Sequence, residues 1–359
     1  MASKTIHHII NDYNLTCGGA QLLVQQIHLE CLKNDINSKL LGISNKPKSN
    51  PISSFSFNTK SPYSFKSFYK LALYFKNNIR NGDVIHAHLF PTIFYISILK
   101  LIFSKINCKY VLTLHNTKDR RRTKWWGKLI DDFTFSNYDN LIAISKGVYN
   151  EYMFWTPKFK DKMSVIYNGT ELNFKKFNKR KKKDFITIIS IGRLHKQKNY
   201  SYAIDVIEKL EEKNIVYKIA GDGKLKKILT NKANNLSLKN KISFLGYVDD
   251  VKTLLLEADI FFMPSLYEGF GIAALEAMNA GLPCVLSDVD GLNELIVKNN
   301  EEGFLVTNNQ TNQLIKILSD LIDDYEKRCF VGENAFKRSK FFDLKNTFYN
   351  YKKIYLSHD

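Results

Sequence analysis

Short apolar runs rich in β-branched and aromatic residues alternate with longer helical patterns along almost the whole chain. The runs are expected to form strands at 4–11, 38–44, 83–89, 108–115, 140–145 and 163–167 and, after a break, at 185–192, 216–220, 242–246, 260–264, 283–287 and 303–306. Helical patterns lie between them, for example at 21–32, 200–211, 251–258 and 313–324. Strands that are apolar throughout belong to parallel sheets covered by helices on both faces. The pattern therefore predicts an α/β fold with two doubly wound parallel sheets.

The alternation restarts once, at the basic segment 175–184, in which seven of the ten residues are Lys or Arg. A single hydrophobic core seldom extends past about 250–300 residues, so a chain of 359 residues is expected to hold two domains. A segment so densely charged predicts a solvated linker. We expect an N-terminal domain at 1–174, the linker at 175–184 and a second domain at 185–340. A C-terminal helix at 341–359 would be free to pack back on the N-terminal domain.

Basic residues exceed acidic ones by 18, and most of the excess lies in the N-terminal half. Residues 1–175 hold 24 Lys and Arg against 11 Asp and Glu, whereas residues 176–359 hold 29 against 24. The excess predicts an anionic partner, which is a nucleic acid, a phosphorylated small molecule or a membrane surface. The five cysteines include no C-x-x-C pair, and neither a signal peptide nor an apolar span of about 20 residues is visible. We therefore expect an intracellular, reducing location, soluble or peripheral to a membrane.

The strand–loop–helix segment that begins at Asp259 carries the most chemical information. Glu268 stands in the loop after the strand, and Glu276 lies about one turn into the helix that follows. Gly269 and Gly271 let the backbone approach a ligand, and the helix start offers free N–H groups to an anion or a hydroxyl. Because carboxylates accept hydrogen bonds strongly, the two glutamates suit a ligand rich in hydroxyls. The alternative is an ordinary loop carboxylate and a solvated helix face.

These two glutamates, seven residues apart in E-G-F-G-x-x-x-L-E-A, resemble the E-x7-E element of retaining glycosyltransferases of the GT-B fold, family 4. In that family the first Glu binds hydroxyls of the donor sugar and the second binds the nucleotide ribose. The resemblance carries these roles to Glu268 and Glu276. It also assigns the intervening donor-binding positions to Gly269, Phe270, Gly271 and Ile272.

A second segment, S-I-G-R-L-H-K-Q-K-N, resembles the family's G-R-L-x-x-x-K element, whose Arg and Lys neutralise the donor diphosphate. The matching residues are Arg193 and Lys198. Two cations five residues apart at a strand–helix turn can flank one diphosphate and stabilise it as a leaving group. Without that role they would serve only as surface charges. Two further loops, around Gly221 and Tyr247, resemble those that surround the nucleotide in the family.

In the N-terminal half, Gly18 and Gly19 resemble the family's Gly-Gly loop, which approaches the donor phosphate. His115 ends V-L-T-L-H and resembles the family's active-site His, although a lone His at a strand end is also commonly structural. His86 and His88 face one side of a strand, so a metal ion could bind there, but no carboxylate cluster supports it. The resemblance implies a reaction that needs no metal and no other cofactor. The expected catalytic residues are His115, Glu268, Arg193 and Lys198.

Two basic segments of the N-terminal half combine cations with aromatic side chains. The first, at 64–80, is expected to be a helix with one apolar face formed by Phe65, Phe68, Leu71, Ala72, Phe75 and Ile79. The second, at 118–128, interleaves cations with Trp125 and Trp126. Such segments suit an anionic lipid surface, although 64–80 is equally compatible with an ordinary helix that covers the core. Single-stranded nucleic acid is another possible partner of such segments, but no nucleic-acid-binding module is recognisable.

The resemblance implies two Rossmann-like domains that face a central cleft, of which the first binds the acceptor and the second the nucleotide sugar. The implied reaction is the retaining transfer of a hexose or N-acetylhexosamine, most simply from a UDP-sugar, to a glycan or a lipid-pyrophosphate-linked glycan. This would place the protein in the assembly of a bacterial polysaccharide such as a capsule or O-antigen. With the basic surface, it predicts a cytoplasmic enzyme at the anionic inner face of the plasma membrane, with no nucleic-acid partner. Two alternatives stay open, a GT-B sugar-nucleotide epimerase and a basic nucleic-acid-binding protein.

Overall fold

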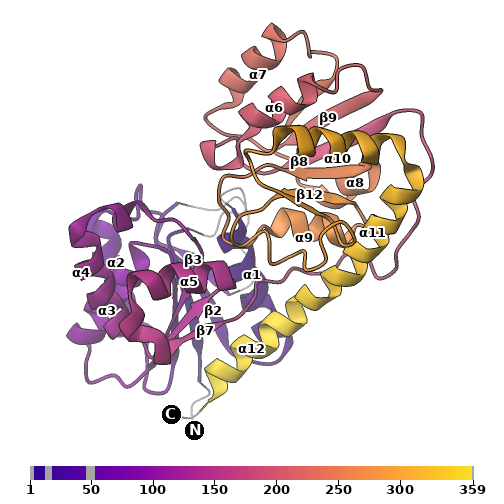
Figure 1. Cartoon of the computed structure of the whole chain (residues 1–359). Coiled ribbons are helices and arrows are strands. Elements are labelled where there is room, and N and C mark those ends of the chain that lie inside the picture. Colours follow the sequence, from indigo (N-terminus) through magenta and orange to yellow (C-terminus); the bar gives the residue numbers. More distant parts are fainter. Residues whose placement is uncertain (1–3, 13–17, 46–52, 358–359) are drawn as a thin grey trace. The chain divides into compact units, whose positions relative to one another are not determined.

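The computed structural model describes residues 4–12, 18–45 and 53–357 (Figure 1). The chain forms two compact units, the first made of Met1–Gly169 and Leu344–Asp359 and the second of Thr170–Asp343. Each unit is built on its own parallel sheet. The expected α/β chain with two doubly wound parallel sheets is thereby confirmed.

In the described part of the first unit the sheet has seven parallel strands in the order β3-β2-β1-β4-β5-β6-β7. The strands are β1 (Ile6–Ile10), β2 (Ser38–Gly42), β3 (Ser54–Ser56), β4 (Val84–His88), β5 (Lys109–Leu114), β6 (Asn140–Ala143) and β7 (Met163–Val165). The helices are α1 (Gly19–Lys33), α2 (Phe65–Asn78), α3 (Thr92–Ile102), α4 (Trp125–Ser136), α5 (Lys146–Trp155) and α12 (Leu344–Leu356). Every residue of β1, β4 and β5 is buried, so the middle of the sheet is covered on both faces.

In the second unit the sheet has six parallel strands in the order β10-β9-β8-β11-β12-β13, all within the described residues. The strands are β8 (Ile186–Ile191), β9 (Ile215–Ala220), β10 (Ile242–Gly246), β11 (Ile260–Met263), β12 (Cys284–Ser287) and β13 (Phe304–Val306). The helices are α6 (Tyr200–Glu208), α7 (Lys226–Asn235), α8 (Val251–Glu257), α9 (Ile272–Asn279), α10 (Thr311–Asp323) and α11 (Tyr325–Ser339). Ile188, Ile204 and Leu318 show how strand and helix side chains share one core on this sheet.

Both sheets reverse their strand order at one point. The chain runs from β1 to β3 toward one edge and from β4 to β7 toward the other, so the reversal lies between β1 and β4. In the second unit it lies between β8 and β11. At such a point the loops beyond the carboxyl ends of the strands diverge and leave room for a ligand. The loops that carry the sequence motifs follow these strands.

Most residues of the basic segment 175–184 are exposed, as its charge predicts, but the segment is not a separate linker between the units. The second unit begins at Thr170, and the segment belongs to it. The guanidinium of Arg180 donates hydrogen bonds to the carbonyl oxygens of Leu255, Leu256 and Ala280, at the ends of α8 and α9. Carbonyls at helix C-termini lack partners within the helix and attract cations, which explains how Arg180 is held there. The charge density therefore marks a segment bound to helix ends.

The C-terminal helix α12 belongs to the first unit. The hydroxyl of Tyr355 lies 2.7 Å from Nδ1 of His86 on β4, and Lys109 Nζ donates to the carbonyl oxygen of Ser357 at 2.8 Å. Lys4 Nζ also donates to the carbonyl oxygen of Tyr355, at 2.6 Å. These contacts attach the end of the chain to the sheet of the unit in which the chain begins.

Helix α2 buries most of the apolar face expected for 64–80, since Leu71, Phe75 and the adjoining Ile79 are buried while Phe68 and Ala72 are half-buried. Its buried residues are Ser67, Leu71 and Phe75, whereas Phe65 is 80% exposed. The hydroxyl of Ser67 lies 2.6 Å from that of Thr59, so a polar pair fills part of the core-facing position. The expected apolar face is therefore confirmed except at Phe65, whose aromatic side chain faces solvent.

The segment 118–128 also differs from expectation, because two of its cations are used inside the unit. Arg121 is buried, pairs with Asp119 at 2.7 Å and Asp131 at 3.1 Å, and its guanidinium lies 3.9 Å from the centre of the Phe90 ring. Arg122 lies over the ring of Tyr152. None of the helices in the described ranges has the length and hydropathy needed to cross a bilayer.

Candidate functional site

The second unit brings most of the predicted site residues to one edge of its sheet. The loop after β8 carries Arg193 and Lys198, the loop after β9 begins with Gly221, and the loop after β11 carries Glu268. Strands β8, β9 and β11 are neighbours in the sheet, and all of them point the same way. The carboxyl ends of parallel strands meet at the same edge, so the three loops lie side by side there.

An ion pair joins two of these loops across the point where the strand order reverses. Lys198 Nζ lies 2.7 Å from Glu268 Oε1, with side chains 15% and 8% exposed. The backbone adds two hydrogen bonds, because Leu266 N donates to the carbonyl oxygen of Gln197 at 2.8 Å and Gln197 Nε2 donates to that of Tyr267 at 2.9 Å. A shielded lysine and carboxylate are thus held on two loops that hydrogen bond to each other.

Two glycines allow the loops to converge so closely. A Cβ atom on Gly221, whose φ is +137°, would lie 2.1 Å from the carbonyl oxygen of Gly192. A Cβ atom on Gly192 would lie 2.8 Å from Cε of Lys198. The overlap at Gly221 is with backbone and excludes any side chain, and Gly192 has φ +155°, a conformation that residues other than glycine rarely adopt. Sequence reasoning gave no role to Gly192, although it lies in the quoted segment next to Arg193.

The loop after β11 leads directly into the start of α9. Gly271 precedes the helix with φ +90°, and Ile272 is the first helical residue. A Cβ atom on Gly271 would overlap Cδ2 of Leu292, 2.3 Å away. Phe270 is buried, with its ring centre 5.3 Å from that of Phe342. Phe270 therefore anchors the loop in the core, while Gly269 and Glu268 continue from it toward the sheet edge.

Glu276 lies in the second turn of α9 and is partly buried. Burial raises its pKa to about 7, from an ordinary value of 4.5. It lines a small pocket within the second unit together with Glu171, Asn173, Phe174, Val251, Lys252, Leu255 and Asn279. The two glutamates of the motif thus occupy different surroundings. Glu268 pairs with a cation, whereas Glu276 is a carboxyl group close to its protonation midpoint at neutral pH.

Two predicted donor residues of this unit are exposed. Arg193 is exposed and forms no ion pair with any of the described residues. Tyr247 is 49% exposed, and partial burial together with a hydrogen bond to Asp249 raises its pKa. A tyrosine that sequence reasoning missed, Tyr200, is buried beside the ion pair and donates to the carbonyl oxygen of Gly192 at 3.3 Å. Tyr200 directly follows the segment S-I-G-R-L-H-K-Q-K-N, and this position is the sequence signal that could have identified it.

The remaining predicted residues belong to the first unit. Gly18 precedes α1 with φ +137°, and Gly19 is the first residue of that helix. His115 follows β5 directly and is buried, and this burial lowers its pKa to about 3. Its Nε2 lies 3.1 Å from Nδ1 of His88, so one of the two rings donates to the other. His115 is therefore an uncharged imidazole at neutral pH, and sequence reasoning missed its contact with His88.

Two family models together match most of the chain. "Glycosyltransferase Family 4" matches residues 38–174 and "Glycosyl transferases group 1" matches residues 171–338. An uncharacterized glycosyltransferase of Methanocaldococcus jannaschii is 34% identical over 282 residues, which cover 71% of this chain and 70% of that protein. The UDP-Gal:alpha-D-GlcNAc-diphosphoundecaprenol alpha-1,3-galactosyltransferase of Escherichia coli is 34% identical over 178 residues, 45% of this chain and 46% of that one.

Solved structures agree on the fold. The crystal structure of Anabaena HepE in complex with UDP-glucose superposes with a TM-score of 0.81 at 19% identity and covers 98% of each chain. Sucrose-phosphate synthase from Thermosynechococcus elongatus superposes with the same score at 16% identity, again over 98% of each chain. At such identities the similarity concerns the architecture, which the chain shares over nearly its whole length.

Proposed function

The chain belongs to the group 1, family 4 glycosyltransferases of the GT-B fold, and we propose that it transfers a hexose or N-acetylhexosamine from a nucleotide-diphosphate sugar, most simply a UDP-sugar, with retention at the anomeric carbon. The observation that carries the proposal is the Lys198–Glu268 pair at the reversal point of the second sheet. The ammonium group of Lys198 can bind a diphosphate, and the carboxylate of Glu268 can accept hydrogen bonds from sugar hydroxyl groups.

In the proposed complex, Lys198 and the exposed guanidinium of Arg193 hold the diphosphate. Donor binding weakens the ion pair between Lys198 and Glu268. Lys198 then donates a hydrogen bond to the phosphate, and Glu268 accepts hydrogen bonds from sugar hydroxyls. Glu276, partly protonated at neutral pH, faces the ribose and can both donate and accept a hydrogen bond. Gly221, Tyr247 and the loop from Gly269 to Ile272 complete the nucleotide site, and Gly18 and Gly19 approach the phosphates.

The proposed chemistry depends on stabilisation of the leaving group. As the bond between the anomeric carbon and the phosphate oxygen breaks, negative charge grows on the diphosphate, and fixed cations lower the barrier most at that moment. The departing phosphate oxygen takes the proton of the acceptor hydroxyl. His115, uncharged at neutral pH, donates or accepts a hydrogen bond at the sugar without adding charge. We propose that this scheme needs neither a metal ion nor another cofactor.

The first experiment compares Glu268→Gln, Lys198→Met and the unmodified enzyme on a panel of UDP-, GDP- and ADP-sugars. A hydrogen bond to a charged group contributes about 1.5–3 kcal/mol, so each substitution is expected to lower kcat/KM by about 10- to 150-fold. The matched control is Glu257→Gln, which removes another glutamate paired with a lysine, at 3.4 Å and on the surface. Near-normal turnover by folded Glu268→Gln would refute the site assignment, and free sugar isomer formed without an acceptor would favour an epimerase.

We propose further that the acceptor is a glycan on a lipid pyrophosphate, in bacterial polysaccharide assembly at the cytoplasmic face of the membrane. Support comes from the Escherichia coli relative, whose name specifies a diphosphoundecaprenol acceptor, and from another named as an O-antigen biosynthesis glycosyltransferase. Product analysis by mass spectrometry with a lipid-pyrophosphate-linked sugar, with the same free sugar and without acceptor tests the proposal. Equal transfer to the free sugar would contradict the need for the lipid.

The membrane surface is proposed on exposed apolar side chains of α2 and α4. Phe65, Tyr69 and Leu73 are spaced four residues apart on α2, and Trp125 and Leu129 are spaced likewise on α4. Side chains at this spacing share one face of a helix, and cations lie among them on both helices. The matching assay is sedimentation with phosphatidylglycerol vesicles against phosphatidylcholine vesicles, and equal binding to both would contradict an anionic surface.

A further inference from the structure

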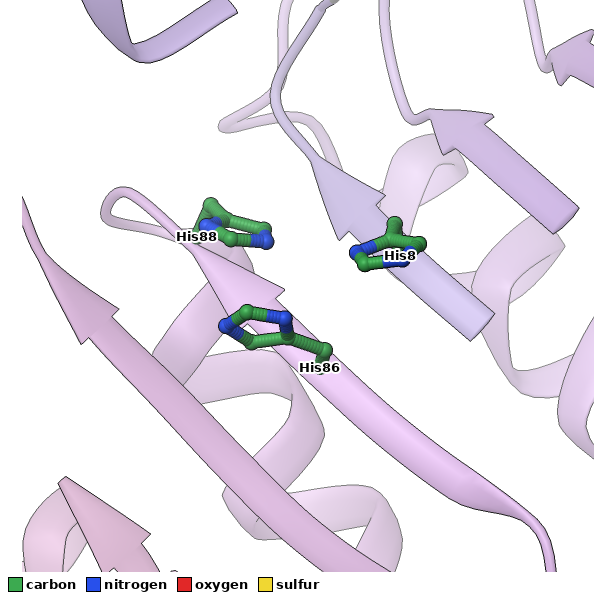
Figure 2. A group of neighbouring side chains, drawn as sticks. All are labelled: His8, His86 and His88. Carbon is green, nitrogen blue, oxygen red and sulfur yellow. The ribbon is translucent and has the colours of Figure 1, made fainter. Parts of the chain in front are cut away.

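Three histidine side chains meet in the core of the first unit (Figure 2). His8 comes from the middle of β1, and His86 and His88 come from β4, the neighbouring strand. His8 and His86 are register partners in the parallel pair, and His88 is two residues further on the same face of β4. All three are at most 2% exposed. The sheet therefore brings three imidazoles from two central strands to one place that solvent does not reach.

The spacing of the three rings fits a small cation. One ring nitrogen from each residue lies within 4.8 Å of those of the other two. The ring centres of His86 and His88 are 4.0 Å apart, and that of His8 is 5.3 Å from His86 and 6.1 Å from His88. A tetrahedral zinc ion with bonds of 2.0–2.1 Å needs nitrogen atoms about 3.4 Å apart. Binding an ion therefore requires the three nitrogens to move closer together than the 4.8 Å within which they now lie.

The hydrogen bonds of the cluster are incomplete in a way that favours a ligand. Within the described part of the chain, neither ring nitrogen of His8 has a hydrogen-bond partner, and Nε2 of His88 has none either. Each unsatisfied buried polar atom costs about 1–3 kcal/mol. A metal ion bound to His8 and to Nε2 of His88 would satisfy one nitrogen in each ring. A bound ion would therefore stabilise the cluster by giving partners to nitrogen atoms that the surrounding apolar side chains cannot satisfy.

Two of the three rings already have an outer hydrogen-bond partner of the kind that orients a ligand histidine. Nδ1 of His88 lies 3.1 Å from Nε2 of His115, which fixes the ring orientation and leaves Nε2 of His88 for the ion. The ring of His86 contacts the Tyr355 hydroxyl through Nδ1 at 2.7 Å and the Thr113 hydroxyl through Nε2 at 2.8 Å. To bind an ion, His86 would give up one of these hydroxyl contacts and keep the other as its orienting hydrogen bond. Ligand histidines normally have such an outer partner.

We propose that His8, His86 and His88 bind one divalent transition-metal ion of the zinc class in the core of the first unit. Three neutral nitrogen donors select zinc, cobalt, nickel or copper over magnesium and calcium, which prefer oxygen. A hydroxide in the fourth position would reduce the net charge that is buried. The ion stabilises the fold and takes no part in the proposed transfer step.

The test uses untagged full-length enzyme, treated with a chelator and then titrated with Zn²⁺ or Co²⁺. We expect one ion per chain, a higher melting temperature with Zn²⁺, and the intense visible absorption of tetrahedral Co²⁺ displaced by Zn²⁺. X-ray absorption of the zinc-loaded enzyme should show ligation by about three imidazoles. Mg²⁺ should bind at least about 100-fold more weakly. A spectrum of six-coordinate cobalt, or no binding by the unmodified enzyme, would overturn the proposal, and these measurements need no variant to fold.

Variants then locate the site. His8→Gln and His88→Gln are expected to weaken Zn²⁺ binding at least about tenfold. The matched control is His28→Gln, which removes an equally buried imidazole whose ring centre is 6.2 Å from that of His8 and whose Nδ1 contacts Ser38. Folded His8→Gln protein that binds zinc as tightly as the unmodified enzyme would refute the assignment. Because the readouts are metal content and melting temperature, the result is independent of any failure of the proposed transferase activity.

Discussion

Replacing Glu276 by Gln measures how strongly the second unit resists a charge at this position. The pKa of Glu276 in the folded protein is about 7, whereas the ordinary value is 4.5. The folded state therefore holds the proton more tightly than the unfolded state, and the enzyme loses stability as pH rises from 4.5 to 7. The difference in pKa corresponds to about 3 kcal/mol, of which about 2.5 kcal/mol is lost between pH 5 and pH 8. Glutamine has nearly the same shape and does not ionise, so the Gln variant does not lose this stability as pH rises.

The assay is urea unfolding of the two proteins at pH 5 and at pH 8, without donor. The Gln variant is expected to gain about 2.5 kcal/mol relative to the unmodified enzyme between the two pH values, with most of the gain complete by pH 7. Buried histidines such as His115 destabilise both proteins equally at low pH, so the comparison cancels them. Glu257→Gln, at an exposed glutamate, is the matched control for the loss of a carboxylate. A difference between Glu276→Gln and the unmodified enzyme that is independent of pH would refute the reasoning.

Two further substitutions test how the second unit is assembled. Gly221→Ala places a Cβ atom 2.1 Å from the Gly192 carbonyl oxygen, at a φ of +137°. We expect the free energy of unfolding in urea to fall by roughly 2–4 kcal/mol and nucleotide binding, measured by calorimetry, to weaken. An unchanged variant would contradict the close approach of the loops. Arg180→Ala removes the donor to carbonyls at the ends of α8 and α9, with an expected loss of roughly 1–3 kcal/mol. Lys182→Ala, at an exposed neighbouring cation, is its control, and equal effects of the two substitutions would contradict the role of Arg180 at the helix ends.

The strands of both sheets were predictable because burial on two faces requires apolar residues throughout, and this pattern is local. Strand β3 was missed because Ser54–Ser56 is a three-residue edge strand with no residue fully buried, so it has no such pattern. The attachment of the segment 175–184 to the second unit was missed for a different reason. Its charge is visible in the sequence, but the carbonyl groups that bind Arg180 lie at helix ends 75 and 100 residues away.

The two sites also differ in how far apart their residues lie in the sequence, and this decides how much of each could be predicted. In the second unit Glu268, Gly271 and Glu276 lie on one continuous strand–loop–helix, so their spacing alone predicts a shared surface, and only the pairing of Lys198 with Glu268 across 70 residues had to come from the structure. In the first unit the sequence shows His86 and His88 on one face of a strand and stops there. The third imidazole, His8, enters because β1 pairs with β4 in a register that sets it opposite His86. Register between parallel strands depends on the whole sheet and its crossover helices. A metal site formed across two strands is therefore visible only once their pairing is known.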